Sequence, residues 1–278
     1  MRQICVTVSG GETSAYNAIL MRKHYADDDL VYIFANTGWE REETLEFLHM
    51  LETEYNLPIV WVEAVIHHGV RKGSTHKIVN FETASRNGEP FQEMCKEYGI
   101  PNKNFIHCTR ELKENPIKSY LRSLGWRKWH TAIGIRCDEL DRVSPDYKKK
   151  RKIYPMAFDW PTTKPDVSWF WHNQPKRLNL KEHEGNCKGC YKKSDRKHAR
   201  LIKEDMEIYK FTMSLESDYG HIKPKEGEVR RNMFRHDLST EDYIKHCSTL
   251  PPWNRDNSTE YGSEDMFGCQ EHCEPFSK

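Results

Sequence analysis

The stretch that decides the fold of this chain is Ser9-Gly10-Gly11-Glu12-Thr13-Ser14, a short turn with two adjacent glycines. An apolar run at 4–8 that favours a strand precedes it, and a pattern with helical spacing follows. Strand, turn and helix in this order direct backbone N–H groups and the positive end of a helix dipole toward an anion. The glycines let a phosphate come close, and the three hydroxyls add donors. The turn therefore predicts a phosphate-binding site.

The same turn also has an ordinary interpretation, a strand-to-helix connection with a capping hydroxyl. It has neither the lysine of the Walker-type loop nor the GxGxxG spacing of a dinucleotide fold. The surrounding elements are therefore needed to decide between the two interpretations.

Two further apolar runs, 30–35 and 59–62, predict strands, and a helix with apolar residues at 47, 48, 51 and 55 lies between them. A fourth run at 130–135 resumes the pattern. Continuously apolar strands that alternate with helices indicate a parallel sheet covered on both faces. We therefore expect an α/β fold with a doubly wound, mainly parallel sheet.

The remaining segments are more polar. Residues 67–104 read as an insertion or mobile loop with one short helix at 91–98. A helix start is predicted at 163–166, and Ser194 is expected to cap a long helix reaching about Leu215. Beyond residue 218 the chain reads as irregular, with a tail that contains Cys and His. We expect a nucleotide-binding α/β domain at 1–160 and a helical, cysteine-containing region at 161–278.

Composition limits the classes of function. The 278 residues include 37% hydrophobic and 12% aromatic residues, with a mean hydropathy of -0.87, which is typical of a soluble globular protein. The net charge of +1 gives no overall field toward nucleic acid or membrane. No apolar run approaches the ~18 residues of a membrane span, and the first apolar stretch is too short for a signal peptide. We expect a cytoplasmic protein without membrane contact.

Nine cysteines in such a chain indicate metal or redox chemistry rather than disulfides. Cys187 and Cys190 form a CxxC knuckle with glycines before and inside it, an arrangement that brings two thiolates to one metal. Thiolate ligands suit an Fe–S cluster or zinc. A structural zinc held by Cys187, Cys190, Cys269 and Cys273, and a redox-active CxxC, are the alternatives. Three cysteines are expected to be inert: Cys5, Cys95 and Cys247.

Four segments together resemble the PP-loop superfamily, which contains adenine-nucleotide α-hydrolases, ATP pyrophosphatases and sulfonucleotide (PAPS/APS) reductases. The turn at 9–14 resembles its SGGxxS pyrophosphate loop, and 34–47 resembles the "DTG…PET" segment, with Asn36 in place of Asp. Residues 108–117 are similar to the CCxxxKxxPL segment, with Thr109 in place of the second cysteine. Residues 134–139 are similar to the "GIRxxE" strand end. The likeness is to the PAPS reductase branch, including phage and bacterial proteins of that family.

The resemblance implies a Rossmann-like sheet with the nucleotide across the carboxyl ends of its strands. It implies that Lys113 and Arg136 neutralise the phosphates, although most single lysines and arginines are surface salt-bridge residues. Many ATP pyrophosphatases carry Asp at the position of Thr13, where it organises magnesium. The nucleotide-binding set implied by the resemblance is Ser9, Gly10, Gly11, Thr13, Ser14, Asn36, Thr37, Gly38, Gly134 and Arg136.

The resemblance also gives Cys108 a role. In the APS reductase branch a CC pair is followed about eighty residues later by CxxC, and the four thiolates hold a [4Fe–4S] cluster; here Cys108 and Cys187 are 79 positions apart. Three positions are kept, with Thr109 at the missing one. A fourth ligand would come from Cys137, Cys269, Cys273 or a non-protein group. Family members with three-cysteine clusters are implied to use the open iron to carry sulfur.

Two other features bear on the acceptor. The tail around Cys269 compares poorly with the ECG(I/L)H tail of sulfonucleotide reductases, whose cysteine attacks the nucleotide sulfur. The basic segments 148–152 and 188–197 are either solvated loops or, with Tyr147 and Tyr191, a site for a polyanion such as tRNA or DNA.

We therefore expect a PP-loop enzyme that binds ATP or a related adenine nucleotide with magnesium. It would adenylate an acceptor with release of pyrophosphate, coupled to sulfur transfer or nucleic-acid modification through a cysteine-bound metal, with a sulfur donor as partner. Lys113, Arg136 and Cys269 are the candidate catalytic residues. The alternatives are a sulfonucleotide reductase that uses Cys269 and a thioredoxin-like partner, and a non-catalytic nucleotide-binding protein.

Overall fold

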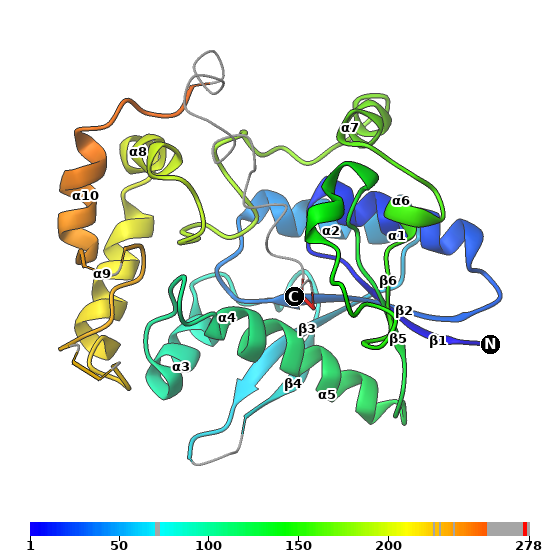
Figure 1. Ribbon diagram of the computed structural model, residues 1–278, viewed down its shortest axis with the longest axis horizontal. Helices are drawn as coiled ribbons and strands as arrows, with labels where there is room; N and C mark the ends of the chain where they lie inside the picture. Colours follow the sequence, from blue (N-terminus) through cyan, green and yellow to red (C-terminus); the bar gives the residue numbers. More distant parts are fainter. Residues whose placement is uncertain (70–72, 225, 228, 236, 255–274, 277–278) are drawn as a thin grey trace.

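The computed structural model describes residues 1–69, 73–224, 226–227, 229–235, 237–254 and 275–276. Its centre is a six-stranded sheet with helices on both faces (Figure 1). The strands are β1 Gln3–Thr7, β2 Asp29–Asn36, β3 Ile59–Ile66, β4 Ser74–Val79, β5 His130–Ala132 and β6 Lys152–Ile153.

The strand order is β4-β3-β2-β1-β5-β6, and every neighbouring pair except β3 with β4 is parallel. The chain winds from β1 outward through β2 and β3 to β4, then returns to the other side of β1 to form β5. The order therefore reverses between β1 and β5, which is where sheets of this kind bind ligands, outside the carboxyl ends of the strands. The predicted doubly wound α/β fold is confirmed.

Helices follow the strands along the chain. In the amino-terminal half they are α1 Glu12–His24, α2 Glu42–Thr53, α3 Glu89–Tyr98, α4 His107–Thr109, a π-helical turn Arg110–Glu114, α5 Asn115–Ser123 and a 3-10 turn Cys137–Arg142. In the carboxyl-terminal half they are α6 Pro155–Phe158, α7 Lys164–His172, α8 Asp195–Glu204, α9 Glu207–Tyr219 and α10 Thr240–Ser248. None of these described helices is long and apolar enough to span a membrane.

The core explains why the strands are apolar throughout. Ile4 and Val6 pack on the face that α1 and α2 cover, whereas Cys5 and Ile33 pack on the opposite face with α5. Because successive side chains of a strand point to opposite faces, a sheet buried on both sides needs apolar residues at every position. A third cluster joins α3 to α8, α9 and α10, which lie together at one end of the molecule (Figure 1).

Three sequence predictions need correction. The insertion at 67–104 contains the predicted short helix, now α3, but also β4, which pairs antiparallel with β3. Ser194 does cap a helix by accepting a hydrogen bond from the Lys197 backbone, but that helix ends at Glu204 and α9 starts separately. The region after 218 is not wholly irregular, since it forms α10, capped by Ser239.

Gly10 is a position where the fold requires glycine. Its φ of 82 lies in the left-handed region, and a Cβ built there would stand 2.4 Å from Cγ2 of Thr44 on α2. Gly125, after α5, has a similar φ of 83 but nothing within 4 Å of such a Cβ. A substitution at Gly125 would thus cause backbone strain alone, whereas one at Gly10 would cause backbone strain and steric overlap.

We predict that Gly125→Ala lowers the free energy of unfolding by about 1–2 kcal/mol, because it imposes left-handed strain alone. Gly10→Ala should lower it by about 2–5 kcal/mol, because overpacking against Thr44 adds to that strain. Urea denaturation of both variants measures the difference. Equal losses in the two variants would show that Thr44 moves aside freely.

Candidate functional site

The turn at 9–14 is organised by Ser14. Its Oγ accepts a hydrogen bond from the Ser9 backbone N–H at 3.0 Å, lies 2.9 Å from the Ser9 Oγ and donates to the Gly11 carbonyl at 3.0 Å. Within the described part of the chain no side chain caps α1, in contrast to α7, α8 and α10. The first N–H groups of α1 therefore keep their capacity to bind an anion.

Arg136 reaches this turn from the end of β5. Its side chain is buried, and its guanidinium donates to the Thr13 Oγ1 at 3.3 Å while also pairing with Asp138 at 2.9 Å and Glu139 at 3.4 Å. Gly134 permits this approach, because a Cβ there would lie 3.3 Å from the Ser14 Cα. The structure thus brings the predicted residues Gly134 and Arg136 to the turn, at the point where the strand order reverses.

The segment 36–38 begins at the last residue of β2 and is held by a buried carboxylate. Asn36 donates through its Nδ2 to Glu63 at 2.7 Å and to the Ser85 carbonyl at 2.9 Å, and its Oδ1 accepts from the Gly38 N–H at 3.2 Å. Glu63 is itself fully buried, accepts from the Ser85 N–H at 2.6 Å and pairs with Lys77 at 2.8 Å. Asn36 therefore shapes the loop through its side chain, and its place beside a nucleoside stays a prediction.

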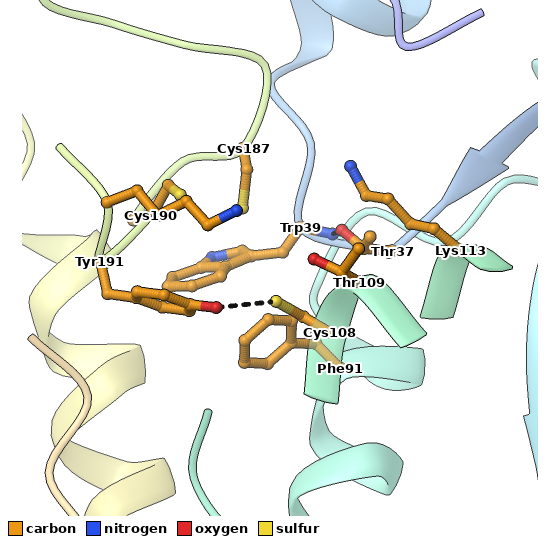
Figure 2. A pocket seen from close by; sticks show the side chains of 11 residues that line it. Thr37, Trp39, Phe91, Cys108, Thr109, Lys113, Cys187, Cys190 and Tyr191 are labelled. Carbon is orange, nitrogen blue, oxygen red and sulfur yellow. Dashed lines mark hydrogen bonds between the residues drawn. The ribbon is translucent and has the colours of Figure 1, made fainter. Parts of the chain in front are cut away.

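A pocket near the carboxyl ends of the strands is lined by the three cysteines that the sequence predicts as metal ligands, Cys108, Cys187 and Cys190. Its walls come from α4 and the π-helical turn on one side and from the CxxC loop on the other (Figure 2). Cys108 lies 3.5 Å from the Tyr191 hydroxyl across the pocket. Thr109, at the position of the second family cysteine, lines the same pocket. The lining residues are Thr37, Trp39, Phe91, Cys108, Thr109, Lys113, Cys187, Gly189, Cys190, Tyr191 and Lys192.

The π-helical turn positions Lys113 in this pocket. The turn inserts an extra residue between Cys108 and α5, and such turns often occur at functional sites. Lys113 is largely buried, and its Nζ lies 3.9 Å from the Glu40 Oε1. The Thr37 hydroxyl donates to the same Glu40 oxygen at 3.0 Å. A cation thus stands between the thiol pocket and the loop that follows β2.

One residue joins the two parts of the site. Asn186, directly before the CxxC motif, donates through its Nδ2 to the Ser9 carbonyl at 2.8 Å and accepts from the Arg41 N–H at 2.7 Å through its own carbonyl. The Lys188 N–H donates to the Trp39 carbonyl at 3.0 Å. The cysteine loop is therefore fastened to the phosphate-binding turn and to the loop after β2.

The sequence did not single out the groups that hold the CxxC knuckle from behind. His198 on α8 lies 3.2 Å from the Cys190 carbonyl and 2.7 Å from the Tyr209 hydroxyl. Burial lowers the pKa of His198 well below its usual value, and the charges of Lys193 and Arg235 lower it further, so the ring is neutral at pH 7. Its spacing of eight residues from Cys190, one turn into the helix capped by Ser194, was the available signal.

The second predicted basic patch is largely internal. Lys193, Arg196 and Lys197 are buried, and Lys193 donates through its Nζ to the Cys187 carbonyl at 2.8 Å. These residues therefore support the cysteine loop rather than form a solvated surface for a polyanion.

Of the candidate fourth ligands, only Cys137 belongs to the described residues. Cys137 starts the 3-10 turn after Arg136 and is not among the described residues that line the thiol pocket. Cys269 and Cys273 lie outside the described residues, so the proposed nucleophile and tail ligands stay predictions.

A further group of metal-ligand types lies beside α8: His183, Glu184 and Glu204 have ligand atoms within 4.8 Å of one another. Burial raises the pKa of Glu204, but Lys181, His183 and Arg200 outweigh it and lower that pKa to about 2. Glu184 pairs with Arg41 at 3.2 Å. These carboxylates are already neutralised by cations, so we assign no metal here.

Comparison with known proteins bears on this geometry. The family model described as the phosphoadenosine phosphosulfate reductase domain matches residues 3–82. The chain is 28% identical over 285 residues to the uncharacterized nin region protein ORF290 of Escherichia phage lambda, covering 98% of this chain and 94% of that protein. It is 27% identical over 197 residues to the uncharacterized protein MJ0973 of Methanocaldococcus jannaschii, covering 68% of this chain and 40% of that protein.

Among solved structures, a phosphoadenylyl-sulfate reductase from Candida auris, crystallised as a phosphate complex, aligns with a TM-score of 0.39 and 14% identity. The alignment covers 64% of this chain and 76% of that chain. The family match and the phage relative confirm the resemblance to the PAPS reductase family that the motifs predicted.

The contact between Asn36 and Glu63 yields a prediction about the departure from the family motif. Asn36→Asp should lower the free energy of unfolding by about 3 kcal/mol or more, because two carboxylates would then meet in a buried site. In a Glu63→Gln background the same change should cost much less, since an amide again faces a carboxylate. Urea denaturation of the four proteins in this double-mutant cycle measures the coupling. Additive losses would contradict the explanation.

Proposed function

Starting from this likeness to the PAPS reductase family, we propose that the chain is an enzyme that binds an adenine nucleotide at the turn 9–14. The observation that carries the proposal is the hydrogen bond from Asn186 to the Ser9 carbonyl, which joins the phosphate-binding turn to the thiol pocket. A nucleotide bound at the turn would therefore lie beside the cysteines. Its binding would change the position of the cysteine loop, because the loop and the turn share this hydrogen bond.

The side chains suit attack on the α-phosphorus of ATP. An acceptor oxygen would form a bond to this phosphorus while the bond to the pyrophosphate oxygen breaks, and pyrophosphate would leave. Arg136, beside Thr13, and Lys113, at the pocket edge, would take up the negative charge that develops. A sulfur nucleophile from a sulfur donor would then displace AMP from the activated acceptor.

The thiol pocket is lined by Cys108, Cys187 and Cys190, which would be the protein ligands of a metal there. Their sulfur atoms do not all lie within 4.8 Å of one another in the described structure, so the cysteine loop and α4 would have to draw closer to hold one ion. Thiolates are donors that zinc and Fe–S clusters prefer, and both groups commonly take four ligands, so a fourth would be needed beside these three. The type of donor does not distinguish zinc from an Fe–S cluster, because both are bound by thiolates. Bound there, an Fe–S cluster would carry sulfur or electrons, and zinc would fix the loop.

A sulfonucleotide reductase is the second candidate, favoured by the family match over residues 3–82. It would need Cys269 as nucleophile and a thioredoxin-like partner as reductant. Pyrophosphate release from ATP in the presence of candidate acceptors separates the two enzymes from each other and from a protein that only binds nucleotide.

Nucleotide affinity tests the role of Arg136. We predict that Arg136→Met weakens binding of ATP or adenosine 3′,5′-bisphosphate about tenfold or more, because a charge-assisted hydrogen bond to phosphate is worth about 1.5–3 kcal/mol. Arg136→Lys, which keeps the charge but loses the fork, should fall between Met and wild type. Isothermal titration calorimetry measures the affinity, and Arg122→Met on the exposed side of α5 is the control. Unchanged affinity in a folded Arg136→Met protein would exclude the proposed site.

Metal analysis tests the thiol pocket. Protein purified without oxygen should contain iron and sulfide with absorbance near about 400 nm, or stoichiometric zinc. Cys187→Ser should lose most of the metal, whereas Cys137→Ser, outside the pocket lining, should keep it. If the wild-type protein contains no metal but still binds nucleotide, the proposed metal site is refuted and the proposed nucleotide site at the turn 9–14 is not.

A further inference from the structure

A second basic site lies at the amino ends of the strands, whereas the turn 9–14 lies at their carboxyl ends. An open hollow of about 470 Å³ forms where β1, β2 and β5 begin. This edge lies at the end of the molecule away from α8, α9 and α10 (Figure 1). The hollow is lined by Met1, Arg2, Gln3, Asp29, Lys128, His130 and Arg151.

The charges in this hollow are unevenly paired. Arg2 forms an ion pair with Asp28 at 2.6 Å. Lys128 and Arg151 are exposed and form no ion pair with any part of the chain that the structure describes. Asp29 is the single carboxylate among the described lining residues. The hollow therefore presents an excess of positive charge that the described residues do not neutralise.

The positive charges of the hollow also act on the pKa of His130, which lines it. Burial lowers its pKa, the charges of Arg2 and Arg151 lower it further, and Asp28 opposes them. The ring thus lies within the influence of two guanidinium groups, and an anion that enters the hollow would meet all three side chains.

The basic run extends this site along the surface. Lys148, Lys149 and Lys150 are exposed, lie directly before Arg151 and form no ion pair with the described residues. The Arg151 N–H donates to the Lys148 carbonyl at 3.1 Å, and the Arg151 carbonyl accepts from the Thr131 N–H at 2.9 Å. These bonds fold the run into a turn on the lip of the hollow, next to β5.

Arg151 is also held in an unusual conformation. Its φ of 54 lies in the left-handed region, which costs a residue with a side chain about 1–2 kcal/mol. The tight turn between Lys148 and Lys152 imposes this conformation, and the Lys152 N–H closes it by donating to the Tyr147 carbonyl at 2.8 Å. The fold thus holds a cluster of exposed cations together although their charges repel.

We propose that this hollow and the adjoining run, Lys148–Arg151, bind the phosphodiester backbone of a nucleic acid. An open hollow continued by a row of exposed, unpaired cations matches a polymer with regularly spaced charges better than a single small anion, which needs a closed pocket with buried donors. The inference stands apart from the nucleotide chemistry, because the site lies at the other ends of the strands.

Fluorescence anisotropy with a labelled short DNA duplex and a labelled RNA hairpin tests the proposal. The wild-type chain should bind one or both, with an affinity that falls steeply with salt. The variant Lys128→Gln/Arg151→Gln should bind about tenfold more weakly, with a slope of log affinity against log salt smaller by about two. Lys210→Gln/Lys245→Gln, on α9 and α10, removes the same charge elsewhere and should match wild type.

Two further arms make the result decisive. Excess ATP should not displace the labelled nucleic acid, so loss of nucleotide binding by Arg136→Met would leave this result unaffected. Titration with inorganic phosphate, followed by the NMR signal of the His130 ring, tests for a small-anion site. Equal weakening in both double variants, or a phosphate response with no nucleic-acid binding, would overturn the proposal.

Discussion

The hydrogen bond between the Asn186 side chain and the Ser9 carbonyl is the contact on which the arrangement of the site depends. It connects positions 177 residues apart, and both partners are buried. The Ser9 carbonyl belongs to a turn that Ser14 and Gly10 already fix, so the bond sets where the cysteine loop can lie. A buried carbonyl without a partner would cost about 1–3 kcal/mol. The loop and the turn are therefore stable together and costly to separate.

Buried charge is the second constraint at this edge of the sheet. Glu63, Lys113 and Arg136 all lie below the surface, and each is opposed by a partner of the other sign. Such pairs contribute little net stability, but removing one partner is costly. Asn36, at the position of Asp in the motif that this segment resembles, faces the Glu63 carboxylate with a neutral amide, so no second negative charge is buried there. The departure from the motif is thus a local electrostatic adjustment.

The part of the fold that could be predicted is the part that apolar patterning controls. Strands buried on both faces are apolar at every position, so β1, β2 and β3 were visible in the sequence. β4 was missed because it is an edge strand with charged and polar residues, Ser74 to Lys77, and its pairing depends on β3 alone. The break between α8 and α9 was missed because helical spacing continues across it, although Asp205 leaves the helical conformation.

The sequence predicted which cysteines belong to the site better than it predicted how the surrounding residues are arranged. Motif spacing identified Cys108 with Cys187 and Cys190, and the structure places all three around one pocket. It did not indicate that Lys193 and Lys197 are buried, since a run of lysines looks the same whether it is solvated or turned inward against carbonyl groups. It gave no role to Asn186, because a single amide carries no pattern, and none to His198, although that ring follows Cys190 by eight residues in the helix that Ser194 caps.

Although the net charge is only +1, the cations at the two ends of the strands differ in whether carboxylates pair with them. At the carboxyl ends the cations are paired with carboxylates, as Arg136 is with Glu139 and Lys113 with Glu40. An anion that binds these cations competes with their carboxylate partners, whereas the N–H groups at the start of α1 have no side-chain cap in the part of the chain that the structure describes, so hydrogen-bond geometry contributes to what binds there. At the amino ends, Lys128 and Arg151 have no such partners among the described residues, and attraction there acts at longer range and is weakened by salt. One edge is therefore suited to selecting a compact ligand, and the other to attracting an extended one.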